Sequence, residues 1–165
     1  MISRAVMTIA GSLGALWALG AVWIGATQIN LPIFSSTPVL LVGFLGPGIF
    51  LALLISIVAT RRRLLRDLEN GGAHEPGSAA DIDARVLQNT LEQTVLALCL
   101  WPAIGFLAAD DGPGIITALA VSFPMSRLVF WAGCRLSHPL RLVGSSATFC
   151  ATMFALVWAL GIWFV

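Results

Sequence analysis

The sequence predicts an all-α integral membrane protein, built as a helical bundle, and two observations lead to this prediction. First, 58% of the 165 residues are hydrophobic and 10% are charged, with a mean hydropathy of +0.93, whereas soluble domains carry roughly a quarter of charged residues. Second, five apolar segments are long enough to cross about 30 Å of hydrocarbon as helices. These segments are residues 5–27, 37–60, 86–109, 114–134 and 143–165.

The first segment resembles a signal peptide in one respect, because Arg4 precedes an apolar run. No small-residue cleavage site with a polar flank interrupts that run, so we expect a retained helix. Residues 1–36 would then be an additional N-terminal helix with an external loop. Ala10, Gly14 and Ala18 recur every four residues on it, either as a face for close helix packing or by chance in a membrane helix.

One substantial loop, beginning at Arg61, separates the second and third segments. It starts with an arginine-rich stretch and continues through a Gly-Gly pair into polar residues. Ser78 is followed three residues later by Asp81, a pattern that caps helices, so the third helix should begin near Ala79, before it enters the bilayer.

Prolines inside the spans predict kinks. These prolines are Pro47, Pro102 and Pro124.

The arginines predict the orientation of the chain in the membrane. In a five-helix arrangement every loop arginine falls on one side, whereas residues 28–36 and 110–112 on the other side carry none. The positive-inside rule then places the N-terminus in the cytoplasm and the C-terminus outside. The arginines on the cytoplasmic side would be Arg4, Arg61, Arg62, Arg63, Arg66, Arg85, Arg135 and Arg141.

Polar residues within the spans mark a candidate site. Arg85, Asn89 and Glu92 open the third span, and their spacing of four and then three residues places them on one helical face. Ionisable residues at membrane depth are candidate functional residues by default. Arg127, inside the fourth span, most needs a partner. One interpretation without any ligand is that Arg127 pairs with Glu92 across neighbouring helices.

Other chemistries receive little support from the sequence. A net charge of +1 and a pI near 7.8 argue against a nucleic-acid partner. The three cysteines, Cys99, Cys134 and Cys150, form no CxxC pair and have no histidine at metal spacing, so neither disulfides nor a metal site are expected. We interpret His74 as a solvated histidine and His138 as a turn histidine.

Two motifs carry a resemblance to a known family. One opens the third span after the arginine-rich loop, and the other ends the fourth span before a short turn and a further arginine. The motifs are Arg85-x3-Asn89-x2-Glu92 and Arg127-x2-Phe130-x2-Gly133, with Arg141 after the turn. In order, they resemble the MAPEG family, the membrane-associated proteins in eicosanoid and glutathione metabolism, in a bacterial form. The resemblance makes residues 37–165 a four-helix membrane domain.

The resemblance implies a homotrimer in a lipid bilayer, such as a bacterial inner membrane. It also implies transferase or peroxidase activity, with glutathione or another thiol as co-substrate and a hydrophobic small molecule as acceptor. Arg141 matches the family's thiolate-stabilising arginine, and a nearby guanidinium does lower the pKa of a thiol. The substrate-binding residues that the resemblance implies are Arg85, Asn89, Glu92, Arg127, Arg62 and Arg63.

Three positions depart from the family pattern. Gln93, Phe130 and Cys134 stand where conjugating members of the family commonly have tyrosines. Two alternatives to an enzyme therefore stay open: a non-catalytic ligand-binding or structural membrane protein, and a small transporter. Transport would require helices that are broken near the middle of the bilayer. The Gly-Pro-Gly segment at residues 46–48 is the feature that suggests a broken helix.

Overall fold

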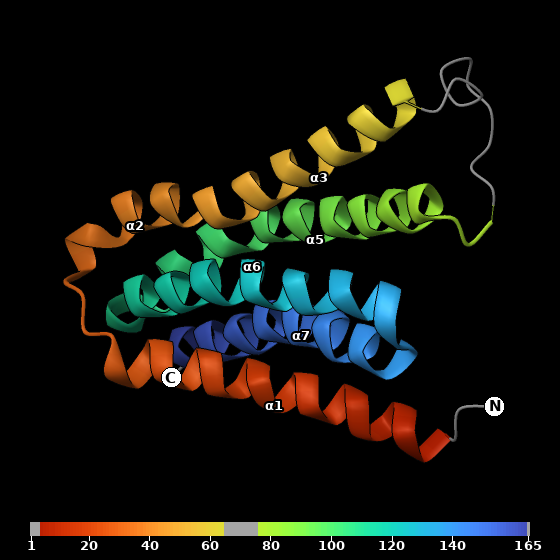
Figure 1. Ribbon diagram of the computed structural model, residues 1–165. Helices are drawn as coiled ribbons and strands as arrows, with labels where there is room; N and C mark the ends of the chain where they lie inside the picture. The colour runs from red at the N-terminus through yellow and green to blue at the C-terminus, as the bar shows by residue number, and fades with distance from the viewer. Residues whose placement is uncertain (1–3, 65–75, 165) are drawn as a thin grey trace.

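The computed structural model describes residues 4–64 and 76–164, which form five helical spans of membrane length. The predicted all-α membrane bundle is therefore confirmed, and the described residues contain no strand. The helices are α1 (Arg4–Gln28), α2 (Ser36–Gly43), α3 (Leu45–Leu64), α5 (Ala79–Leu107), α6 (Gly112–Leu136) and α7 (His138–Trp163) (Figure 1). Single 3-10 turns, Ile33–Ser35 and Ala109–Asp111, precede α2 and α6.

The spans run up and down the bundle, and α6 is its central helix (Figure 1). It packs against α1, α2, α3, α5 and α7. On one side of α6 lie α5 and then α3, and on the other side lie α7 and α1. In this arrangement the end of α6 meets the start of α5 and the start of α7, so three spans meet at one end of the bundle.

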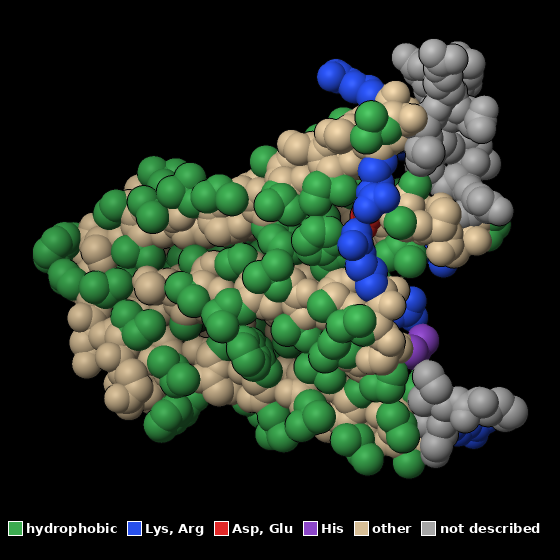
Figure 2. Space-filling view, viewed as in Figure 1, with side chains coloured by type: hydrophobic (Ala, Val, Ile, Leu, Met, Phe, Trp, Pro, Cys, Tyr) green, Lys and Arg blue, Asp and Glu red, His purple; other side chains and the backbone are tan. Residues whose placement is uncertain are grey.

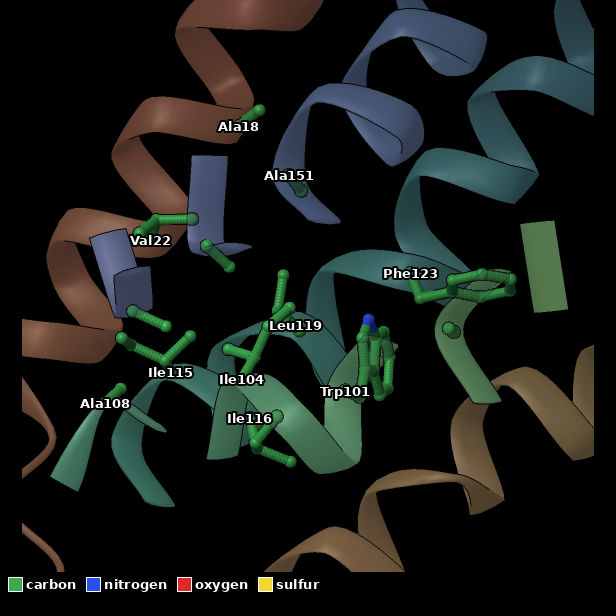
Figure 3. Close-up of a cluster of buried hydrophobic side chains, with 13 residues drawn as sticks. Ala18, Val22, Trp101, Ile104, Ala108, Ile115, Ile116, Leu119, Phe123 and Ala151 are labelled. Atoms are coloured by element: carbon green, nitrogen blue, oxygen red, sulfur yellow. The ribbon is translucent and has the colours of Figure 1, made fainter. Parts of the chain in front are cut away.

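The main apolar core surrounds Trp101 on α5, whose side chain is 1% exposed (Figure 3). The Trp101 ring stacks on Phe44 at a centroid distance of 5.5 Å and meets the edge of Phe123 at 6.1 Å. Its indole nitrogen donates to the Thr152 hydroxyl at 3.3 Å. Buried Trp normally satisfies its N–H in this way. Close packing of this kind holds helices together in a membrane, where lipid is as apolar as the core.

Helix α1 packs on α7 and α6 through its small residues. Ala10, Gly14 and Ala18 are all buried, which settles the choice left open by the sequence in favour of a packing face. A polar contact supports this face, because the Trp17 indole donates to the Ser122 hydroxyl of α6 at 2.8 Å. The additional helix is thus an integral part of the bundle.

The start of α5 confirms a local prediction from the sequence, and the start of α3 contains one of the prolines. Helix α5 begins at Ala79 as expected, and the Ser78 side chain accepts a hydrogen bond from the Asp81 backbone N–H at 3.2 Å. Pro47 lies in the first turn of α3, three residues after Phe44, the turn residue between α2 and α3. Proline is tolerated in a first turn because that turn's N–H groups have no partner within the helix.

The described arginines, apart from Arg127, gather at one end of the bundle, as the sequence predicted for its loop arginines (Figure 2). We call this end the arginine end. Its residues are Arg4, Arg61, Arg62, Arg63, Arg85, Arg135 and Arg141. Arg66 and His74, about which the sequence also made predictions, lie outside the described residues.

The packing of α1 can be tested at Gly14. An added Cβ there would overlap the Ser146 hydroxyl and lie 2.5 Å from the Val143 carbonyl oxygen of α7. Gly14→Ala should therefore lower the free energy of unfolding by about 1–3 kcal/mol through overpacking. Gly11→Ala is the matched control, because no atom lies within 4 Å of its added Cβ. Equal melting temperatures for the two variants in one detergent would show that α1 does not pack on α7.

Candidate functional site

A pocket of about 380 Å³ lies at the arginine end, between the start of α5, the end of α6 and the start of α7. Six of its ten lining residues have polar side chains. The polar side chains are Asp81, Arg85, Asn89, Cys134, Arg141 and Ser145, and the apolar wall is formed by Ile82, Phe130 and Leu142. The pocket thus brings together Arg85, Asn89 and Arg141, three of the residues predicted to form the site.

Arg85 lies at the rim of the pocket and is oriented by its own helix. Its guanidinium contacts Asp81 one turn earlier, through Nε at 3.1 Å and a terminal nitrogen at 2.9 Å. The Arg85 side chain is nevertheless 70% exposed. An exposed pair spaced four residues apart contributes only about 0.3–0.5 kcal/mol, so Arg85 can turn toward a ligand at little cost.

Arg141 reaches the pocket because α7 approaches α6 very closely at its first turn. A Cβ added to Gly133 would overlap the backbone of Arg141, so the glycine of the second motif permits this approach. The chain reverses through Ser137, whose extended backbone ends α6 and begins α7. The Arg141 guanidinium lies 3.0 Å from the His138 ring nitrogen. No carboxylate pairs with Arg141 among the described residues.

Arg127 is fully buried behind the pocket wall and is surrounded by neutral acceptors. Its guanidinium donates to the Thr148 hydroxyl at 2.7 and 3.0 Å and to the Gly144 carbonyl oxygen at 3.1 Å. It also lies 4.6 Å from the centre of the Phe130 ring. Because a buried charge is costly unless it is well hydrogen-bonded, these contacts hold α6 and α7 in one relative position.

The remaining contact of Arg127 fixes the orientation of Asn89. A terminal nitrogen of Arg127 donates to Asn89 Oδ1 at 2.7 Å. A guanidinium has no acceptor, so the amide oxygen must face Arg127, and the amide nitrogen is left for other partners. Because Asn89 lines the pocket, its two N–H donors are available to a bound group there. Arg127 therefore shapes the pocket without lining it.

The alternative interpretation, a pair between Arg127 and Glu92, is wrong within a single chain. Glu92 is exposed on α5 and accepts a hydrogen bond from Gln88 at 3.0 Å, while Arg127 takes Asn89 and Thr148 as partners. Glu92 does not line the pocket. The spacing of the motif correctly indicated a shared helical side, but it could not show how far along the helix the pocket extends.

Arg62 and Arg63 are exposed in the last turn of α3 and lie outside this pocket. Their neighbour Arg61 instead reaches a residue that sequence reasoning missed, the buried Asp83. Asp83 also contacts Arg135 and accepts from the Trp131 indole at 2.9 Å. Asp83 could have been found in the sequence as an acidic residue in the first turns of a membrane helix. Arginines without an assigned partner lie at the same end of two other helices.

One known protein family matches most of the chain. A model described as the MAPEG family matches residues 39–161. The matched region contains every residue of the pocket and leaves out α1. No curated protein and no solved structure gives a significant match.

Proposed function

The chain belongs to the MAPEG family, and from that premise we propose that it is a membrane-embedded transferase or peroxidase that uses glutathione, or another small thiol, on lipophilic electrophiles. The family includes glutathione transferases and peroxidases together with other membrane proteins, so membership alone does not assign an activity. The observation that carries the proposal is the pocket, where Arg85, Asn89 and Arg141 converge from two helices.

The polar groups of the pocket match the charges of glutathione, which has two carboxylates and one ammonium. Arg85 and Arg141 provide two cations for the carboxylates. Asp81, which pairs with Arg85 in the ligand-free protein, would meet the ammonium once Arg85 turns toward a carboxylate. Asn89 offers its amide donors to a carbonyl oxygen. Glutathione is therefore the co-substrate that we propose, and no step of the reaction requires a metal.

Arg141 is the residue that we propose to stabilise the thiolate. It lies in the first turn of α7, where the N-terminal end of a helix also favours negative charge. The thiol proton would leave to water at the arginine end. The thiolate sulfur would then form a bond to an electrophilic carbon, whose leaving group departs with the bonding electrons. The electrophile would reach the sulfur from the surrounding lipid.

A homotrimer is part of the proposal, because α5 carries features that suit a covered face. Glu92 is exposed within the span, beside the exposed apolar side chains of Leu91 and Val95. A carboxylate that faces lipid is costly. A neighbouring subunit on this face would shelter Glu92, and the exposed Arg62 and Arg63 could then contribute to a ligand site between subunits.

A non-catalytic ligand binder is the second candidate, and the pocket wall favours it in one respect. Phe130 and Cys134 line the pocket at positions where conjugating family members commonly have tyrosines, so two hydroxyl donors are missing from the wall. Transport has less support. The Gly-Pro-Gly segment that suggested it, residues 46–48, lies within the first turn of α3. The nearby helix end at Phe44 stacks on Trp101 in the apolar core, and its side chain offers no polar group to a cargo.

The orientation that we propose places the arginine end in the cytoplasm, because arginines are retained on that side of a membrane. A reporter fused after the last residue should therefore be active on the external side. A reporter inserted between Pro76 and Ser78 should be active in the cytoplasm. A cytoplasmic signal from the C-terminal fusion would contradict this orientation.

The thiolate proposal can be tested by ultraviolet difference absorbance with added glutathione. Wild type should show bound thiolate about one to three pH units below the ordinary pKa of the thiol, because a nearby cation favours the charged form. Arg141→Ala should remove this signal and slow conjugation of a hydrophobic electrophile about a hundredfold.

The matched control is Arg4→Ala, which removes another arginine of the same end, on α1 and outside the pocket. It should leave the thiolate signal and the rate unchanged. If glutathione binds but no thiolate forms below pH 8 in wild type, the protein is a non-catalytic binder. If Arg4→Ala and Arg141→Ala lose the signal equally, the assignment of Arg141 is wrong.

A further inference from the structure

A second charged group lies at the arginine end, outside the pocket. We call it the Asp83 clasp, and it consists of Arg61, Asp83, Trp131 and Arg135. One oxygen of the buried Asp83 carboxylate lies 2.7 Å from Arg61 Nε, and the other contacts a terminal nitrogen of Arg135. Trp131 donates to that second oxygen at 2.9 Å, and its ring lies 4.9 Å from the Arg135 guanidinium. The clasp joins α3, α5 and α6.

Counted over the described residues, the clasp carries one positive charge more than its carboxylate neutralises. Two guanidiniums share a single carboxylate, whose side chain is 0% exposed. The arginine side chains are 36% and 41% exposed for Arg61 and Arg135. Arg61 contacts Asp83 through Nε, as an ion pair without hydrogen-bond geometry, and neither of its terminal nitrogens has an acceptor among the described residues. Arg135 likewise keeps Nε and one terminal nitrogen free there.

The position of the clasp sets the kind of anion that can reach it. Arg61 lies in the last turn of α3, Arg135 in the last turn of α6, and Asp83 near the start of α5. All three therefore lie where membrane spans end, which is the depth of lipid head groups. Figure 2 shows basic side chains in a column at this end, with an acidic side chain visible between them. Arg62 and Arg63 add further exposed charge in the same last turn of α3 as Arg61.

We propose that the Asp83 clasp binds the phosphate of an anionic phospholipid. Guanidinium groups bind phosphate oxygens through paired N–H donors, and here the Asp83 and Trp131 contacts hold the donors in place before the lipid arrives. A phosphate is attracted by the surplus charge, while Asp83 keeps the empty site from carrying two unpaired cations. No clasp residue lines the pocket, so this site does not depend on the proposed function.

The test is a thermal-shift titration of the full chain in a neutral detergent, without glutathione. The probes are phosphatidylglycerol, phosphatidylcholine and inorganic phosphate. Phosphatidylglycerol should raise the melting temperature of wild type at low concentration. Arg135→Lys keeps a charge beside Asp83 but loses the planar donor pair. It should raise the midpoint concentration about fivefold or more, which corresponds to about 1 kcal/mol, because the phosphate loses a charge-assisted hydrogen bond while the charge itself is kept.

Arg61→Lys is measured in parallel and should behave like Arg135→Lys, so the result does not depend on one variant folding. Arg4→Lys is the matched control at the same end, on α1, and should change the midpoint less than about twofold. The proposal is overturned if both clasp variants titrate like wild type, or if Arg4→Lys is equally affected. It is also overturned if phosphatidylcholine or inorganic phosphate gives the full shift.

Discussion

The buried guanidinium of Arg127 is the interaction on which this end of the bundle depends. It is 0% exposed and has only neutral hydrogen-bond acceptors among the described residues, from Asn89 on α5 and from Gly144 and Thr148 on α7. Loss of any acceptor would leave a charge in a low-dielectric interior, where hydrogen bonds to charged groups contribute about 1.5–3 kcal/mol. The three helices are therefore restricted to the relative positions that satisfy Arg127.

The lining of the pocket depends on these restricted positions of α5, α6 and α7. Asn89 lines the pocket while its oxygen is held by Arg127, which leaves its amide donors unused by that contact. Phe130 also lines the pocket and lies against the buried guanidinium. Arg141 comes within reach because α7 contacts α6 at Gly133. Outside the pocket, the Asp83 clasp joins α5 and α6 to α3. Helix α1 contacts α6 and α7 and lies on the side of them away from α5. A polar pocket can thus persist among apolar helices.

Much of the fold could be predicted from the sequence, because span length and the cap at Ser78 are local properties, whereas the small residues of α1 left its packing face open. The partners of charged residues could not. Arg61, Asp83 and Arg135 are far apart in sequence, and only the packing of three helices brings them together. Likewise, Asn89 and Glu92 are one turn apart, and the position of α6 along α5 decides that Arg127 contacts Asn89.

The central claim is that Arg127 orients Asn89 for ligand binding, and Thr148→Val tests it most directly. Thr148 holds Arg127 but does not line the pocket. Calorimetric titration with glutathione should show a Kd about tenfold higher than for wild type, since Arg127 loses its main acceptor. The matched control is Thr152→Val, because Thr152 lies one turn further along α7 and accepts a hydrogen bond from Trp101. This variant should keep the wild-type Kd. An unchanged Kd for Thr148→Val, with wild-type binding intact, would contradict the account.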